Sequence, residues 1–333
     1  MRKLLAAALA ALTAAFASPA LAEVSEITIT RGDGVGFLPL MVMEKHQLIE
    51  KKAAEAGIDL KVNWVNISGS GAVNDALLSG SAQFISGGIP GMLTLWDRTK
   101  GKQDVVGVGS ISSQPMYLNT SSEKLKSLDD VTEADKIAVT AIKISIPAII
   151  MQMYAREKYG EGETFRFDPF TVAMKHPDGV AALLSGAAGI TAHYTSPPFH
   201  QREIKDPKIR TIQTTNDVMG GSTSFAIMVA TKKFRDDNPK VFKAVFDGLA
   251  ESQSFIKDNK EESAQILLDS MGGRGWEVSE LVEVLNDPDI KFDITPENVM
   301  RYAEFMNAVG SINNKLGAWT EMFAEEAHSL SGS

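Results

Sequence analysis

Four short loops combine glycine, serine or threonine with a proline at the start of an expected helix. They are Gly36-Phe37-Leu38-Pro39, Ser86-Gly87-Gly88-Ile89-Pro90, Lys143-Ile144-Ser145-Ile146-Pro147 and Thr195-Ser196-Pro197-Pro198. Glycine lets a backbone approach a bound molecule closely, and the free N–H groups of a helix start attract an anionic or strongly polar group. Capping alone explains any single loop of this kind. The set is better evidence for a binding site than any member, and Ser68-Gly69-Ser70-Gly71 adds a fifth start.

Residues for covalent or metal chemistry are sparse. The chain has no cysteine, which excludes a disulfide, a thiol nucleophile, cysteine-ligated zinc and a lipid-anchored cysteine. His193 and His200 flank two prolines and Asp206 follows, but no nucleophile elbow or metal-spaced cluster completes a hydrolytic site. The glycines of Gly32-Asp33-Gly34-Val35-Gly36 match a dinucleotide fingerprint only in part. We therefore expect a protein that is not an enzyme, with no catalytic residue, metal or cofactor.

An internal repeat predicts two similar lobes. Ala76-Leu77-Leu78-Ser79-Gly80 recurs as Ala182-Leu183-Leu184-Ser185-Gly186, 106 residues later, and each copy ends a helix at a glycine suited to the left-handed conformation. Two pairs of helix-starting prolines share nearly the same offset: Pro39 with Pro147 (108 residues) and Pro90 with Pro197 (107 residues). Helix starts gather at one edge of an open α/β sheet, so two such edges facing each other would form a cleft.

The elements that must position these loops alternate between strands and helices. Strands are expected at 26–30, 60–65, 82–85, 105–108, 117–119, 137–140, 165–172, 189–194, 209–214 and 224–230. Helices are expected between them, for example at 39–56, 73–79, 147–159 and 178–185, and from Lys233 onward the chain is helical. This alternation is typical of an α/β protein with mostly parallel sheets covered on both faces.

The N-terminus has the pattern of a signal peptide. Arg2 and Lys3 precede an apolar stretch of alanine and leucine that ends in Ala20-Leu21-Ala22, so we expect cleavage after residue 22 and export to the periplasm. Cleavage would remove Arg2 and Lys3, so the mature chain keeps 31 of the 33 basic residues and all 42 acidic residues. Its net charge is therefore about −11. An acidic surface disfavours nucleic acid and anionic membranes.

These loops and the repeat together resemble the substrate-binding proteins of nitrate/sulfonate/taurine-type ABC importers, a type II periplasmic binding protein family. The matching stretches are 34–40, 66–84, 86–91, 137–147 and 192–199. The resemblance implies two Rossmann-like lobes joined by a two-strand hinge, with the C-terminal helices packing on lobe 1. The implied division is residues 1–22 as signal peptide, 23–115 with 226–333 as lobe 1, and 116–225 as lobe 2.

Carried over by position, the resemblance implies ligand contacts in both lobes and at the crossover. They are Gly36, Phe37, Ser70, Gly71, Gly87, Gly88, Lys143, Ser145, Thr195, Ser196 and Ser222. These loops lack the acidic metal-binding set of bicarbonate-type members, and they also lack an arginine clamp for sulfonate. Lys143 is the only cationic residue in them.

The substrate class stays open between a small organic anion, such as a sulfonate or carboxylate, and a pyrimidine-like heterocycle. The implied partners are this small molecule and an inner-membrane permease, with the protein a monomer. A ligand-sensing role is the alternative to import. A relationship to the enzyme that makes the thiamine pyrimidine is disfavoured. That type of enzyme has a cysteine-rich segment, whereas this chain has no cysteine.

Overall fold

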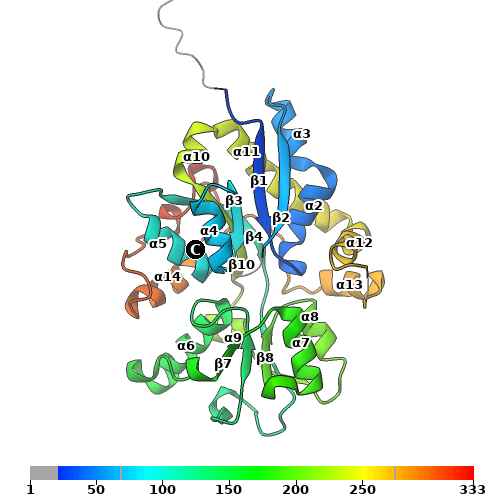
Figure 1. The fold of residues 1–333 in the computed structure, drawn as a ribbon, viewed down its shortest axis with the longest axis vertical. Coiled ribbons are helices and arrows are strands. Elements are labelled where there is room, and N and C mark those ends of the chain that lie inside the picture. Colours follow the sequence, from blue (N-terminus) through cyan, green and yellow to red (C-terminus); the bar gives the residue numbers. More distant parts are fainter. Residues whose placement is uncertain (1–21, 68–69, 274) are drawn as a thin grey trace, which may run out of the picture.

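The computed structural model describes residues 22–67, 70–273 and 275–333. The predicted signal peptide lies outside the described residues except for Ala22, and so do Ser68 and Gly69. The described chain forms two lobes stacked along the long axis of the molecule (Figure 1). Each lobe is built around one five-stranded sheet, which confirms the prediction of a two-lobed α/β protein.

The sheet of lobe 1 has the order β2-β1-β3-β10-β4. Its strands are β1 (Glu26–Arg31), β2 (Lys61–Asn66), β3 (Phe84–Gly87), β4 (Val105–Ser113) and β10 (Ser224–Thr231). β1 is parallel to β2 and β3, whereas β10 runs antiparallel to both of its neighbours. Along β10 every residue from Ser224 to Ala230 is buried, as expected for a strand covered on both faces.

The sheet of lobe 2 repeats this arrangement in the order β7-β6-β8-β5-β9. Its strands are β5 (Tyr117–Thr120), β6 (Ile137–Val139), β7 (Thr171–Ala173), β8 (Ala192–Thr195) and β9 (Arg210–Thr214). β6 is parallel to β7 and β8, and β5 is antiparallel to β8 and β9. The fourth strand in each order is β10 in lobe 1 and β5 in lobe 2. Each of these is the first strand after the chain crosses over from the other lobe.

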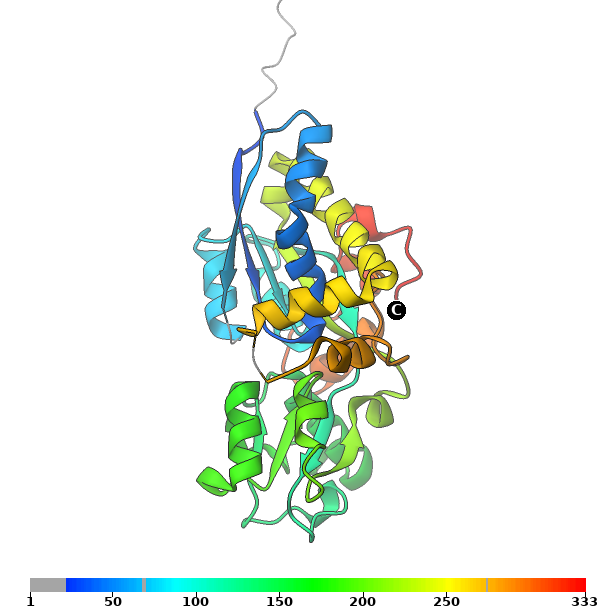
Figure 2. The ribbon, with the colours of Figure 1, turned by 90° about the vertical axis from the view of Figure 1, so that its right-hand side faces the viewer.

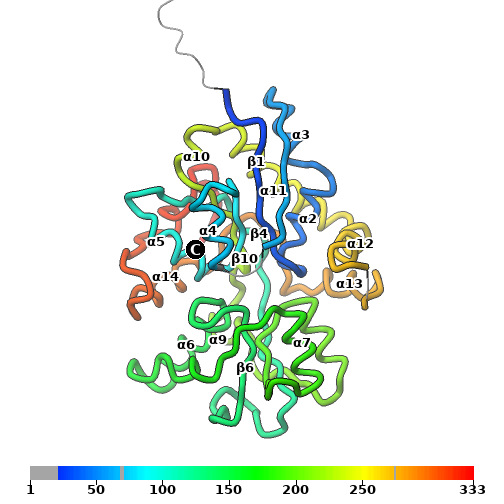
Figure 3. Tube along the Cα trace, in the orientation of Figure 1, coloured from blue at the N-terminus to red at the C-terminus, as the bar shows by residue number. Residues whose placement is uncertain are grey.

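Two crossovers join the lobes, one after β4 and one before β10 (Figure 3). The division predicted after residue 115 falls in the first crossover, between Ser113 and Tyr117. The division predicted after residue 225 falls just inside β10.

Helices cover both faces of the lobe 1 sheet. They are α2 (Leu38–His46), α3 (Leu48–Glu55), α4 (Ser70–Leu78), α5 (Ile89–Thr99), α10 (Lys232–Asp237), α11 (Pro239–Asp258), α12 (Lys260–Ser270), α13 (Val278–Leu285) and α14 (Val299–Ala308). α11 packs on α2 and α3, α12 on α2, and α14 on α5, so the C-terminal helices return to lobe 1 as predicted (Figure 2). No helix among the described residues has the length and apolar character needed to span a membrane.

The helices of lobe 2 are fewer and mostly shorter. They are α6 (Ile146–Tyr159), α7 (His176–Ser185), α8 (Phe199–Glu203) and α9 (Thr215–Met219). Short 3-10 turns occur in both lobes: η2 (Val35–Phe37), η3 (Leu128–Asp130), η4 (Glu161–Glu163), η5 (Asp168–Phe170), η6 (Ala187–Gly189), η7 (Trp319–Glu321) and η8 (Glu325–Ala327).

The repeated segments occupy equivalent places in the two lobes. α4 and α7 each end at the repeated Leu-Leu-Ser-Gly segment, and the glycines that follow, Gly80 and Gly186, have φ of 77° and 68°. Pro39, Pro90 and Pro147 lie in the first turns of α2, α5 and α6, as predicted. Pro197 differs, because α8 begins only at Phe199.

Several predictions are wrong in extent. The strand predicted at 189–194 begins only at Ala192, because η6 ends at Gly189, and the α-helices predicted from Lys233 onward end at Ala308 among the described residues. The strand predicted at 165–172 is reduced to β7, because Asp168-Pro169-Phe170 forms the turn η5 and Gln152 Nε2 donates to Asp168 Oδ1 at 3.0 Å. The helix predicted at 39–56 is two helices, because Gln47 takes a left-handed conformation with φ of 50° and ends α2.

Candidate functional site

A cavity of about 390 Å³ lies between the lobes. Lobe 1 contributes Gly32, Asp33, Phe37, Ile67, Val73, Ser86, Gly87, Gly88, Gly91 and Met92. Lobe 2 contributes Thr140, Ala141, Ile144, Ser145, Ile146, Pro147, Ala173, Met174, Lys175, His176, Pro177 and Phe199, and the crossovers contribute Met116 and Phe225. This size lies in the range typical of small-molecule sites, and the wall is complete only when both lobes are present.

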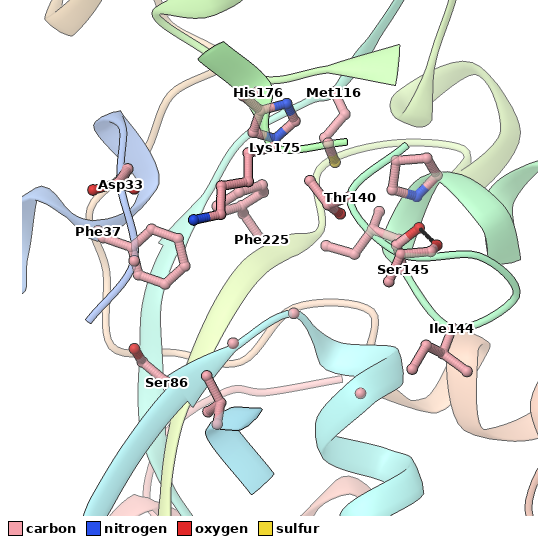
Figure 4. A pocket seen from close by; sticks show the side chains of 18 of the residues that line it. Asp33, Phe37, Ser86, Met116, Thr140, Ile144, Ser145, Lys175, His176 and Phe225 are labelled. Carbon is pink, nitrogen blue, oxygen red and sulfur yellow. Dashed lines mark hydrogen bonds between the residues drawn. The ribbon is translucent and has the colours of Figure 1, made fainter. Parts of the chain in front are cut away.

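Most of the wall is apolar. Phe37 from lobe 1 and Phe225 from the crossover meet edge to face, with ring centroids 5.8 Å apart. Three methionines, Met92, Met116 and Met174, add flexible and polarisable surface to the wall. A molecule held here would bury an apolar body against aromatic and thioether groups (Figure 4).

The helices α2, α5, α6 and α7 start at the cavity wall, which contains their N-cap residues Phe37, Gly88, Ser145 and Lys175. Ser145 is the N-cap of α6, where its Oγ accepts from the N–H of Ala148 at 3.4 Å and donates to the carbonyl of Ala141 at 2.6 Å. The hydroxyl of Ser145 is therefore already engaged in capping. The unpaired N–H groups of the helix starts are what remains to interact with a polar guest.

Two charged side chains face the cavity. Lys175 is the N-cap residue of α7 and is the one lysine or arginine among the described lining residues. Among the described residues, every ion pair made by a lysine involves a lysine other than Lys175. Asp33, from lobe 1, accepts from Asn66 Nδ2 at 2.6 Å. In Figure 4 the Lys175 side chain extends toward the side of the cavity where Asp33 and Phe37 lie.

His176 connects the cavity to a buried polar network in lobe 2. Its Nδ1 lies 3.2 Å from Nε2 of His193, and Nδ1 of His193 lies 2.5 Å from Oε1 of Glu203. His193 and Glu203 are both 0% exposed. Burial, together with the neighbouring His193, lowers the pKa of His176 to about 3, so this imidazole is neutral at pH 7.

A second buried histidine borders the same network. His200 stacks on Tyr117 with ring centroids 3.7 Å apart, and its Nδ1 lies 3.1 Å from Asn119 Nδ2. Burial lowers the pKa of His200 to about 4, although the charge of Asp287 opposes this shift. Because Asn119 donates to its Nδ1, His200 acts as an acceptor there and carries its hydrogen on Nε2.

The lobes also meet directly at the rim of the cavity. The N–H of Val35 donates to the carbonyl of Pro197 at 3.3 Å. On another side Arg202 Nη1 donates to the carbonyl of Gly275 at 2.9 Å. In the part of the chain that the structure describes, no group of three or more His, Asp or Glu side chains is placed to hold a metal ion.

The comparisons with known proteins agree with this architecture. The sequence profile of the NMT1-like family matches residues 22–268, more than half of the chain. The chain belongs to this family. No curated protein sequence matches it.

Several of the solved structures similar to this NMT1-like protein are named as binding proteins. The periplasmic aliphatic sulphonate-binding protein SsuA from Escherichia coli has a TM-score of 0.68 at 16% identity, over 90% of this chain and 98% of that chain. The alkanesulfonate-binding protein SsuA from Xanthomonas axonopodis pv. citri bound to MOPS has a TM-score of 0.67 at 14% identity, over 90% and 98%. The periplasmic nitrate-binding protein NrtA from Synechocystis PCC 6803 has a TM-score of 0.60 at 18% identity, over 81% and 74%. At these identities the likeness establishes the periplasmic binding protein fold, and the fold implied by the sequence resemblance is confirmed.

The structure brings four of the sequence-predicted contacts together at the cavity wall: Phe37, Gly87, Gly88 and Ser145. Gly36, Thr195 and Ser196 are buried outside the wall, and Gly71 and Lys143 are exposed outside it. Ser222 lies at the second crossover, where its Oγ donates to Glu297 Oε2 at 2.7 Å. The side chain of Ser70 is not among those described.

The other lining residues of this NMT1-like protein were not predicted as ligand contacts from its sequence, among them Lys175, His176, Met116 and Phe225. The repeat offset gives a signal for two of them. Adding 106 to Gly69 and Ser70 of the fifth helix start leads to Lys175 and His176, just before and at the first residue of α7. His193 pairs with Glu203, a residue that the sequence analysis did not single out.

Proposed function

We propose that this protein is a periplasmic solute receptor that holds a small organic molecule between its lobes and delivers it to the permease of an ABC importer. The observation that carries the proposal is one cavity whose wall needs both lobes and the crossovers. Such a site releases its guest when the lobes separate and encloses it when they approach. The sulfonate- and nitrate-binding names of the structural neighbours support the same role.

The wall chemistry favours an organic anion with an apolar body. Lys175 supplies positive charge, and the helix starts at Gly88, Ser145 and Lys175 add N–H donors. The apolar residues need a ligand with carbon surface to cover them, which disfavours nitrate itself. An alkyl or aryl sulfonate or carboxylate satisfies both requirements.

Among the contacts predicted from the sequence, we propose that Phe37, Gly87, Gly88 and Ser145 touch the ligand, together with Lys175 and His176. The lining positions of these residues support this choice. Phe37 would cover the apolar body, and Lys175 would bind the anionic group.

A pyrimidine-like heterocycle is the second candidate ligand. Phe37 and Phe225 present an edge-to-face aromatic pair to the cavity, and a flat ring can stack against either face. In that case His176 would hydrogen-bond to a ring substituent.

A thermal-shift and calorimetric screen tests both candidates. The purified mature protein is mixed with sulfonates, carboxylates, nitrate, pyrimidines and flavins, because a ligand that binds the folded state raises its apparent stability. We expect one molecule bound per chain for one organic class. No stabilisation by any member at saturating concentration would reject the solute-binding proposal.

Two further measurements test location and role. N-terminal sequencing of the exported protein should begin at Glu23. Uptake of the identified ligand should fail in a strain without the neighbouring permease, whereas unchanged uptake would favour a sensing role. Sedimentation of the purified protein should give a monomer.

A further inference from the structure

The buried pair of His193 and Glu203 lies one residue behind the cavity wall and is connected to it through His176. The three side chains form a continuous row, with His176 Nδ1 3.2 Å from His193 Nε2 and His193 Nδ1 2.5 Å from Glu203 Oε1. An ionisable pair with no exposed surface is costly for stability unless its hydrogen bonds are well satisfied. The connection of this pair to the cavity through His176 points to a role in ligand binding.

The hydrogen positions in this row are constrained from its inner end. Asn119 Nδ2 donates to Glu203 Oε2 at 2.8 Å, and Thr211 Oγ1 donates to Asn119 Oδ1 at 2.7 Å, which fixes the orientation of the amide. With Glu203 ionised, its carboxylate only accepts hydrogen bonds, so His193 Nδ1 then carries a hydrogen and donates it to Glu203. The protonation of His193 Nε2 is then the one open choice in the row.

The row therefore has two states that present opposite chemistry to the cavity. When His193 is neutral, its Nε2 accepts from His176 Nδ1, and His176 Nε2 faces the cavity as a bare acceptor. When one proton enters at His176 Nε2, the hydrogen on His176 Nδ1 passes to His193 Nε2. His193 becomes a cation paired with Glu203, and His176 stays neutral but now carries an N–H directed at the cavity.

We propose that ligand binding in this cavity is coupled to the uptake of one proton through His176 to His193, so that an anionic ligand is bound in the donor state of the relay. This inference rests on the proposed solute-binding function. An anionic group and a bare imidazole acceptor repel each other, whereas the same group accepts a hydrogen bond from the protonated relay. A ligand that brings its own hydroxyl or amine donor would select the neutral state instead.

The surroundings of His193 favour this assignment. Its neighbours are His176 of α7, Glu203 of α8 and Asn119 of β5. On the side of β6 it lies opposite Ala138. Gly179 of α7 makes room for the ring, since a Cβ there would lie 2.5 Å from His193 Nε2. Lys175, beside His176, is the charge nearest the outer end of the relay in sequence.

Three other titratable side chains in or near the relay, His176, His200 and Tyr117, are neutral at pH 7. Burial keeps the pKa of His176 at about 3 and that of His200 at about 4, and raises the pKa of Tyr117. Of the rings in this cluster, His193 is the one whose Nδ1 lies next to a carboxylate oxygen, that of Glu203.

Nitrogen-15 NMR of the histidine rings tests the relay without any ligand. The chain has five histidines, so His176→Gln and His193→Gln spectra assign the two rings. As the pH is lowered, we expect the added proton to appear on His193 while His176 changes from the Nδ1–H to the Nε2–H tautomer at the same midpoint. A His193 that stays neutral throughout, or a His176 tautomer that does not follow His193, overturns the proposal.

Calorimetry with hexanesulfonate tests the coupling, because this probe keeps its charge over the whole pH range. We expect binding to tighten as the pH falls, by up to about tenfold per pH unit for one linked proton. Glu203→Gln, which removes the carboxylate that stabilises the proton, should bind with no pH dependence. His176→Phe, which keeps the stack on Phe199, should do the same.

The outcomes separate the relay from the proposed function. Binding of hexanesulfonate with the same pH slope in the wild type and in Glu203→Gln would overturn the relay and leave solute binding intact. If hexanesulfonate fails to bind at any pH, the sulfonate ligand class is rejected and the NMR experiment alone decides the relay. Circular dichroism confirms that each variant is folded.

Discussion

Gly36 lies directly beneath the ring of Phe225: a Cβ at Gly36 would lie 2.3 Å from Cδ1 of that ring. Gly36 belongs to the turn η2 of lobe 1, whereas Phe225 lies in β10 at the second crossover and lines the cavity. Ser112 Oγ donates to the carbonyl of Gly36 at 2.8 Å and holds this turn in place. The absence of a side chain at Gly36 therefore sets how deeply Phe225 can sit and how wide the cavity is.

Gly36→Ala should push the Phe225 ring into the cavity. We expect a loss of ~1–3 kcal/mol in the free energy of unfolding, which is typical of an added methyl group in a packed interior, and weaker binding of the cavity ligand. Urea denaturation measures the first effect and calorimetry the second. Unchanged stability and affinity would show that the ring has room to move elsewhere.

Gly71→Ala is the matched control. Gly71 lies in the first turn of α4, and no atom lies within 4 Å of a Cβ placed there. Alanine is favoured over glycine in a helix by up to ~1 kcal/mol, so this variant should be as stable as the wild type or more so. Its affinity for the ligand should not change.

Much of the fold could be predicted because it depends on local patterns. Alternating or continuous β-rich runs marked each of the ten strands that the structure describes, and the glycines of the repeated segment marked the ends of α4 and α7. The errors occurred where a tertiary contact or an unusual conformation overrides the local pattern. Gln47 is not a residue type expected to end a helix in the left-handed region, yet it divides α2 from α3.

Lys175→Ala should weaken binding of an anionic ligand. Loss of a charged hydrogen bond typically costs ~1–3 kcal/mol, which corresponds to roughly a ten- to hundredfold rise in Kd. Calorimetry with the best sulfonate or carboxylate from the screen measures the change. A heterocyclic neutral ligand should be affected far less.

Lys143→Ala is the comparison for Lys175→Ala. Lys143 is exposed and lies outside the cavity wall, where its charge acts on Asp168 and opposes the rise that burial causes in the pKa of that carboxyl. We expect an affinity within about twofold of the wild type. If Lys143→Ala weakens binding and Lys175→Ala does not, the assignment of the ligand-binding cation is reversed.

The candidate site was harder to predict than the fold. Phe37, Gly87, Gly88 and Ser145 follow from helix starts, whose positions are visible in the sequence. Phe225 reaches the cavity from a crossover strand, so nothing local marks it. The pairing of His193 with Glu203 depends on how α8 packs on α7 and β5, and ten residues of separation give no hint of a contact.

The neutral histidines predict a loss of stability in mild acid. The pKa of His200 is lowered to about 4 in the fold, and the unfolded value is near ~6.5. Between these values the unfolded chain binds a proton that the fold does not, so the stabilisation present above pH ~6.5 is lost as the pH falls toward 4, at up to ~1.4 kcal/mol per pH unit. Urea unfolding between pH 4 and 7.5 should show a shallower slope in His200→Gln. Equal slopes would contradict the shift.

Gly34 allows lobe 1 to touch lobe 2, and its replacement should separate effects on binding from effects on stability. Gly34 has φ of 92°, and a Cβ there would lie 3.2 Å from the carbonyl oxygen of Pro197 in the other lobe. Gly57 has φ of 80° but nothing within 4 Å of a Cβ. Alanine at either position should cost ~1–2 kcal/mol of backbone strain. Only Gly34→Ala also holds the lobes apart, so it should weaken ligand binding and increase the radius of gyration measured with ligand by small-angle scattering. Equal affinities for Gly34→Ala and Gly57→Ala would mean that the Gly34–Pro197 contact plays no part in closing the cavity.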